Sequence, residues 1–232
     1  MSHCVAFIAG AGPGVLMTAT KARGAYPREV SDGLQILLGV LIGYMIGMFP
    51  SADLVTRVAT RGQVDLRASG SGNPGGLNAA RVLGKKWGLA VIILDVAKGT
   101  IAGFVGLALG DAGAYAAGTA VIAGHCWPVW NGFRGGKGVA AAGGSFLAVF
   151  PAMTPINGAA TVAVVLATRN SRFAIRTSLA VWVVAAVVWW AADLPNWWGP
   201  AAGPGLLVYA VLGAGMVLVR FWKTDRAGGG SL

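Results

Sequence analysis

The sequence has few charged side chains for its length. Only 11% of its 232 residues are charged, whereas a soluble domain usually has about 25%. Hydrophobic residues make up 56% of the chain, and the mean hydropathy is +0.67. Because a water-facing surface needs more charge than this, we predict an all-α protein that crosses a membrane several times.

The side chains of acid–base and nucleophilic catalysis are also scarce. Glu29 is the only glutamate, and the chain has two histidines and two cysteines. Cys4 and Cys126 form no C-x-x-C pair, and neither a G-x-S-x-G nor an H-E-x-x-H motif occurs. We therefore expect no disulfide framework, no metal site and no cofactor. A reaction on this chain would depend on positioning and charge stabilisation.

Glycine and positive charge are abundant instead. The 37 glycines are typical of membrane helices that pack closely. The formal net charge of +10 would suggest nucleic acid in a soluble protein. In a membrane protein we attribute it to topology and an anionic ligand, and expect no nucleic-acid partner.

Several apolar windows approach the helix length that spans the hydrocarbon core, about 20 residues. The segment 139–168 could form one hairpin, which leaves six spans as the alternative. We predict seven transmembrane helices, at about 34–57, 87–109, 112–130, 139–151, 153–168, 177–192 and 204–222.

Basic residues fall on one side of this arrangement. If the spans alternate, the loops at 58–86, 131–138 and 169–176 share a side with the tail that starts at Arg220, and these segments are rich in Lys and Arg. The loops on the other side have no Lys or Arg. By the positive-inside rule the basic side is cytoplasmic, so the N-terminus lies outside and the C-terminus inside.

The chain ends are assigned no function. We interpret residues 1–33 as an N-terminal extension and residues 227–232 as a disordered tail. The membrane domain is then 34–226.

The first basic loop contains the run Gly70-Ser-Gly-Asn-Pro-Gly-Gly-Leu-Asn-Ala-Ala-Arg81. A glycine-rich backbone can direct several N–H groups at one anion, and Arg81 adds a fork that suits phosphate. A flexible polar linker is the alternative, but a linker has no need of Pro74 beside the paired Asn73 and Asn78. We predict a phosphate site in this loop.

The second basic loop reads Gly124-His-Cys-Trp-Pro-Val-Trp-Asn-Gly-Phe-Arg-Gly-Gly-Lys-Gly138. Three glycines surround Lys137, and a helix that starts after Gly138 would direct its N-terminus at an anion. Positive charge that only sets topology is the alternative, but it needs no glycines. His125 has two interpretations, a general base or a residue that fixes the loop by hydrogen bonding, and we favour the second.

Charges elsewhere are weaker signals. The third basic loop, residues 168–178, has hydroxyls as well as arginines, but a solvated face explains it almost as well. Asp95 and Lys98 lie three residues apart within a span, where we favour a structural ion pair over ligand contact. Asp53, near the end of the first span, is interpreted as reaching the interface.

The two loop runs and Asp95-Val-Ala-Lys-Gly99 resemble, in order and spacing, the signatures of the bacterial acyl-phosphate:glycerol-3-phosphate acyltransferases of the PlsY type. The resemblance extends from about residue 34 to the C-terminus. It implies a seven-helix enzyme of the bacterial cell membrane with its active site on the cytoplasmic side. Its substrates would be acyl phosphate and glycerol 3-phosphate, and its products lysophosphatidic acid and phosphate, in the first step of phospholipid synthesis.

The resemblance also implies residue roles. Ser71, Arg81 and Lys137 would be catalytic: they would bind phosphate, orient the substrates and stabilise charge. Substrate binding would involve a larger set of glycines and polar residues, namely Gly72, Asn73, Gly75, Asn78, His125, Gly135, Gly136, Gly138 and Ser178.

The sequence departs from the family pattern in three places. Gly76 and Leu77 stand where Ala-Thr is usual, Ile175 and Arg176 interrupt the serines of the third signature, and Phe221 follows Arg220 where His and Asn are common. Two alternatives therefore stay open beside the acyltransferase. One is a transporter of a phosphorylated solute; the other is a weak or non-catalytic paralogue with an altered acceptor.

Overall fold

The computed structural model describes residues 31–226 of the chain. This part is helical, without strands, so the all-α prediction is confirmed. The predicted extension lies outside the described residues except for 31–33, and the predicted tail lies wholly outside them. The described chain forms nine α-helices and two 3₁₀ turns: α1 (Asp32–Gly47), α2 (Ser51–Thr60), α3 (Gly76–Val82), α4 (Lys85–Leu109), α5 (Asp111–Cys126), η1 (Val129–Asn131), α6 (Val139–Val149), η2 (Pro151–Met153), α7 (Thr154–Thr168), α8 (Ser171–Ala191) and α9 (Pro204–Arg226).

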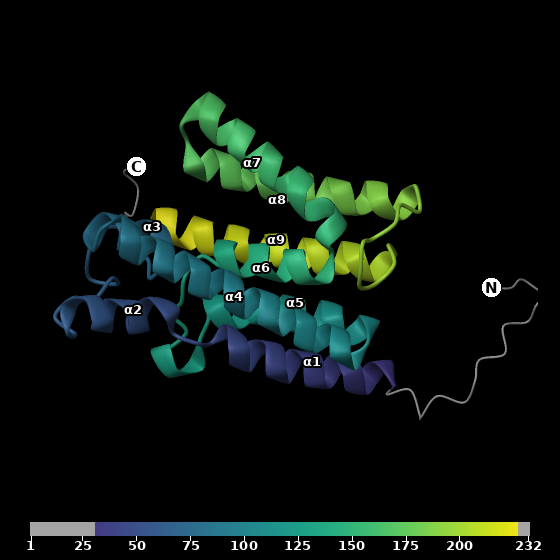
Figure 1. The fold of residues 1–232 in the computed structure, drawn as a ribbon, viewed down its shortest axis with the longest axis horizontal. Helices are drawn as coiled ribbons and strands as arrows, with labels where there is room; N and C mark the ends of the chain where they lie inside the picture. Colours follow the sequence, from purple (N-terminus) through teal and green to yellow (C-terminus); the bar gives the residue numbers. More distant parts are fainter. Residues whose placement is uncertain (1–30, 227–232) are drawn as a thin grey trace, which may run out of the picture.

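The axes of the long helices are roughly aligned, and successive long helices run in opposite directions (Figure 1). α4, α5, α6 and α9 form the centre, α1 packs on α5, and the α7–α8 hairpin packs on α9 through α8. One end of the bundle gathers α2, α3, the loop at 127–138 and the α7–α8 turn. The three basic loops thus lie at the same end, as the predicted topology requires.

Five segments of the described chain are long and apolar enough to cross a membrane, and α6 is a shorter apolar helix. The count of seven spans and their orientation stay predictions. The first predicted span is not one continuous helix, because α1 ends at Gly47 and α2 begins at Ser51. Pro50 lies at the break, and proline disfavours helical backbone in the residue before it. The segment 139–168 forms two helices, α6 and α7, joined by η2.

Glycines bring α1 and α5 into backbone contact. Gly39, Gly43 and Gly47 follow one another at intervals of four along α1 and are all buried. A Cβ atom at Gly39 would lie 2.8 Å from the carbonyl oxygen of Gly113, and one at Gly43 would overlap the carbonyl group of Ala117. Only glycine permits this approach.

A buried polar contact joins α5, α6 and α9 in the centre of the bundle. The Ser145 hydroxyl donates to the Gly118 carbonyl oxygen at 3.0 Å and lies 2.6 Å from the Tyr209 hydroxyl oxygen. Ser145 and Tyr209 are almost fully buried. Since unpaired polar groups are costly in such surroundings, this contact fixes α9 relative to the other two helices.

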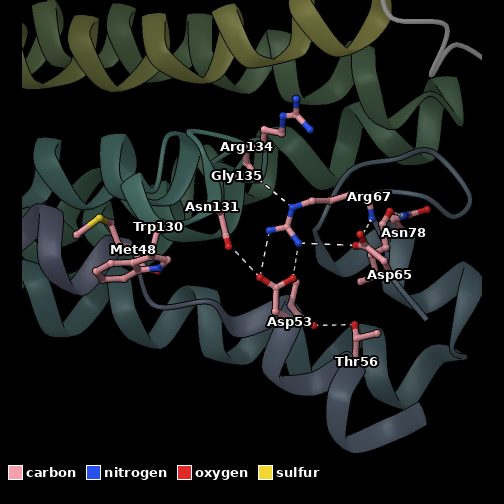
Figure 2. A network of polar contacts seen from close by, with 12 residues as sticks. Met48, Asp53, Thr56, Asp65, Arg67, Asn78, Trp130, Asn131, Arg134 and Gly135 are labelled. Carbon is pink, nitrogen blue, oxygen red and sulfur yellow. Dashed lines mark hydrogen bonds and ion pairs between the residues drawn. The ribbon is translucent and has the colours of Figure 1, made fainter. Parts of the chain in front are cut away.

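Asp53 connects α2 to both glycine-rich loops (Figure 2). Its carboxylate accepts two hydrogen bonds from the Arg67 guanidinium and a third, of 3.0 Å, from the Asn131 side-chain amide. Arg67 Nε also donates to the carbonyl oxygen of Arg134 at 3.1 Å. The interpretation that Asp53 reaches the interface stays a prediction, but the residue has a further role, since it braces the first loop against the second.

The glycine contact yields a stability prediction. Gly43→Val should force α1 and α5 apart and destabilise the protein by about 1–3 kcal/mol or more, as overpacking does in other cores. The measurement is thermal unfolding in detergent. Gly215→Val in α9 is the matched control, since a Cβ there meets no atom within 4 Å. Equal unfolding temperatures for the two variants would contradict the packing account.

The ion pair yields a second prediction. A double-mutant cycle with Asp53→Ala and Arg67→Ala should give a coupling free energy of about 1 kcal/mol, because both side chains are partly exposed but the contact is two-pronged. Chemical unfolding of the two single variants and the double variant in detergent measures it. Additive effects would show that the brace contributes nothing.

Candidate active site

A cavity of about 310 Å³ lies at the basic end of the bundle, between α3, α4, α6 and the ends of α8 and α9. Residues of both glycine-rich loops, which are separate in the sequence, line this cavity. Most of the predicted site residues line it: Ser71, Asn73, Gly75, Asn78, Arg81, His125, Lys137 and Gly138.

The charged residues of the cavity lining favour anions. Arg81 and Lys137 line it, and so does Arg172 from the third basic loop, whereas Asp95 is the acidic residue among the described lining. α6 begins at its wall, directly after Gly138, as the sequence predicts. α8 begins there as well, with Ser171. Both helix N-termini add a favourable field for phosphate.

Asn78 organises the first loop from within. Its side-chain oxygen accepts from the backbone N–H of Ser71 at 2.8 Å, and its amide nitrogen donates to the carbonyl oxygens of Leu66 and Ser69 at 3.0 and 2.9 Å. The residue is only 2% exposed. Both of its amide hydrogens are therefore used within the loop, and direct contact of Asn78 with a substrate stays a prediction.

The second loop folds back onto the end of α5. The N–H groups of Gly135 and Gly136 donate to the carbonyl oxygens of Cys126 and His125 at 3.2 and 3.1 Å. A Cβ atom on either glycine would overlap atoms of His125. These two glycines therefore allow close approach within the protein, and their N–H groups are already engaged. Gly138 has a φ of 84° and precedes α6, a left-handed conformation that favours glycine.

A buried charged cluster lies beside the cavity. The predicted pairing of Asp95 with Lys98 is confirmed, with Oδ1 and Nζ 3.0 Å apart. Lys98 Nζ also donates to the Phe49 carbonyl oxygen at 3.0 Å, at the break between α1 and α2. His125 Nδ1 lies 3.4 Å from the same Asp95 oxygen, without the alignment of a hydrogen bond. Both interpretations of His125 stay open.

Four predicted residues do not line the cavity. Gly72 lies in the first loop with a φ of 69°, and Gly135 and Gly136 border a separate small cavity of about 20 Å³ next to His125. The Ser178 hydroxyl donates to the side-chain oxygen of Asn157 at 3.1 Å, between α8 and α7. Substrate contact by these residues stays a prediction.

Apolar side chains also line the cavity. Ile92 and Val96 of α4, Val139 and Gly143 of α6, and Ile175 of α8 form this apolar wall. A phosphate group attached to a hydrocarbon chain matches such a mixed lining, because the basic residues suit its charge and the apolar helix faces suit its chain.

Sequence reasoning missed several lining residues. Ser171 and Arg172 belong to the third basic loop, where Ser178 had been the candidate, and Phe221 lies near the end of α9. The signal for the first two was Asn170, whose side chain accepts from the Phe173 N–H and caps α8. Phe221 was noted only as a departure from the family pattern, because an aromatic residue in an apolar helix usually belongs to the core.

Comparison with known proteins agrees with this geometry. The family described as glycerol-3-phosphate acyltransferase matches residues 37–226. A protein named glycerol-3-phosphate acyltransferase 4 from Dehalococcoides mccartyi is 46% identical over 115 residues, which are 49% of this chain and 61% of that protein. The glycerol-3-phosphate acyltransferase of Thermoanaerobacter pseudethanolicus is 39% identical over 155 residues, which are 66% of this chain and 77% of the relative.

A solved structure has the same fold. It is the crystal structure of PlsY, an integral membrane glycerol 3-phosphate acyltransferase, in its glycerol 3-phosphate form. The TM-score is 0.69 at 29% sequence identity, over 82% of this chain and 90% of that one. The family match covers more than half of the chain, and the fold is that of an integral membrane protein. The chain therefore belongs to the glycerol-3-phosphate acyltransferase family.

Proposed function

We propose that this protein transfers a fatty acyl group from acyl phosphate to the sn-1 hydroxyl of glycerol 3-phosphate, giving lysophosphatidic acid and phosphate. The single observation that carries the proposal is a cavity lined by both basic and apolar residues, at the end of the bundle where the basic loops meet. Membership of the family supports it. By the positive-inside rule this end lies on the cytoplasmic side of a bacterial cell membrane.

The donor fits the apolar wall and the second loop. The hydrocarbon chain of acyl phosphate lies between α4, α6 and α8, and its phosphate lies at the N-terminus of α6 beside Lys137. There the ammonium group offsets the negative charge that grows on the leaving phosphate. The apolar side chains of these helices contact the hydrocarbon chain and leave none of its methylene groups against a charge.

The acceptor fits the other polar residues of the lining. Arg81 and Arg172 have the guanidinium forks that suit a phosphomonoester, and Ser71 and Asn73 add neutral polar groups. With both phosphates held, the sn-1 hydroxyl oxygen attacks the acyl carbon and the bond from that carbon to the phosphate oxygen breaks. The hydroxyl proton passes to a substrate phosphate. No acyl-enzyme forms, so the step depends on orientation and charge.

An altered acceptor is the second candidate, and one observation favours it. Leu77 and Ile175, which replace the hydroxyl residues of the family pattern, both line the cavity. The wall is more apolar there than Thr and Ser would make it. An acceptor with fewer hydroxyl groups than glycerol 3-phosphate would lose less from this change.

Turnover tests the proposal. Purified protein should release phosphate only when both acyl phosphate and glycerol 3-phosphate are present. Lys137→Ala and Arg81→Ala should each lower kcat/KM about 100-fold or more, because each removes a charge from the cavity lining. Lys85→Ala and Arg57→Ala are matched controls, since these exposed residues lie outside the cavity lining. Full activity in the two cavity variants would refute the assigned roles.

A panel of phosphorylated acceptors separates the two candidates. Glycerol 3-phosphate should give the highest kcat/KM if the proposal holds. A higher value for a phosphorylated alcohol with one hydroxyl would favour the altered acceptor. Uptake of labelled glycerol 3-phosphate into proteoliposomes without acyl phosphate would instead indicate a transporter.

A further inference from the structure

The C-terminal part of α9 contacts the second loop through one helix face. Val217, Arg220 and Phe221 lie three and four residues apart, so their side chains share a face. Val217 and Phe221 are buried, with 0% and 3% exposure. A Cβ atom on Gly138 would lie 3.4 Å from Val217 Cγ2. This face of α9 is therefore packed against the end of the loop.

Arg220 binds the backbone carbonyl groups of Gly135 and Gly136, the two residues that precede Lys137. Its guanidinium donates from Nε to the Gly136 carbonyl oxygen at 3.1 Å and from Nη2 to the Gly135 carbonyl oxygen. The N–H groups of the same two glycines donate to the end of α5. The backbone before Lys137 is thus held by α5 through its donors and by α9 through its acceptors. A charged donor makes such bonds stronger than neutral ones.

Phe221 contacts the lysine itself. The Lys137 Nζ atom lies 4.3 Å from the centroid of the Phe221 ring, over its face, well within the range of about 6 Å for a cation–π contact. Phe221 also lines the cavity. The ring restricts a side chain that has four rotatable bonds, and it does so where Lys137 lines the cavity.

We propose that Arg220 and Phe221 are positioning residues that together fix the Lys137 ammonium where the donor phosphate binds. Arg220 sets the backbone, and Phe221 sets the side chain. The charge is then oriented before the substrate arrives, which is the condition under which electrostatic stabilisation is most effective. For its kinetic test the inference rests on the proposed acyl transfer.

Substitutions at Phe221 separate the ring face from packing volume. Phe221→Leu keeps an apolar side chain and loses the ring, whereas Phe221→Tyr keeps both. We expect Phe221→Leu to lower kcat/KM for acyl phosphate about threefold to thirtyfold, and Phe221→Tyr to stay within about twofold of the unsubstituted protein. Phe173→Leu is the matched control, because Phe173 is exposed and lies outside the lining. Equal kcat/KM values for Phe221→Leu and Phe221→Tyr would overturn the role of the ring.

Hydrogen exchange tests Arg220 without turnover. The amides of Gly135 and Gly136 should exchange about tenfold faster in Arg220→Met, which removes the donors but keeps a long stem. Arg220→Lys should give an intermediate rate, because it keeps the charge without the fork. Phe221→Leu should leave this exchange unchanged, since the ring acts on the side chain. Unchanged exchange in Arg220→Met would overturn the role of Arg220.

A labelling experiment keeps the inference independent of the proposed activity. Acetylation of Lys137 by a water-soluble activated acetyl ester can be followed by mass spectrometry, with the exposed Lys85 as internal reference. We expect faster labelling of Lys137 in Phe221→Leu than in Phe221→Tyr. If the unsubstituted protein releases no phosphate, the proposed function fails, and exchange and labelling still decide the positioning role. Equal labelling in the two variants would overturn it.

Discussion

Backbone-to-backbone contact at glycine is the constraint on which the rest of this structure depends. In α1, three glycines at intervals of four place the helix directly on α5. Between α4 and α6, a Cβ atom at Gly99 would overlap the Ala141 carbonyl oxygen, and one at Gly144 would overlap that of Val96. Helices that approach so closely gain dispersion contacts that lipid cannot replace. Their alternation then brings the basic loops to one end of the bundle.

The close approach that glycine allows also shapes the second loop, but not in the way that the sequence suggests. A run of glycines around a lysine predicts backbone N–H groups that point at phosphate. In the structure, Gly135 and Gly136 direct these groups at the end of α5, and their carbonyl oxygens accept from Arg220. The loop therefore presents the Lys137 side chain and the start of α6 to the cavity.

Much of the fold could be predicted from the sequence, because apolar windows and basic loops follow from bilayer thickness and the positive-inside rule. The break at Pro50 was not predicted, although Pro50, Ser51 and Asp53 interrupt the apolar window 34–57. The site could be predicted where chemistry is local, as with Arg81 and Lys137. It could not be predicted where a contact joins distant segments: Asp53 pairs with Arg67 and Asn131 only because three segments meet. The contact of the Phe221 ring with Lys137 also joins distant segments, and no local pattern in the sequence reveals it.

In the proposed reaction, one cavity holds an acyl donor and a phosphorylated acceptor so that the acyl carbon, not the phosphorus, is attacked. Acyl phosphate labelled with heavy oxygen at the bridging position tests this directly, with glycerol 3-phosphate as acceptor and mass spectrometry of both products. Attack at the acyl carbon predicts that the label leaves with the phosphate and that lysophosphatidic acid forms without it. Label retained by a fatty acid, or no lysophosphatidic acid at all, would contradict attack at the acyl carbon.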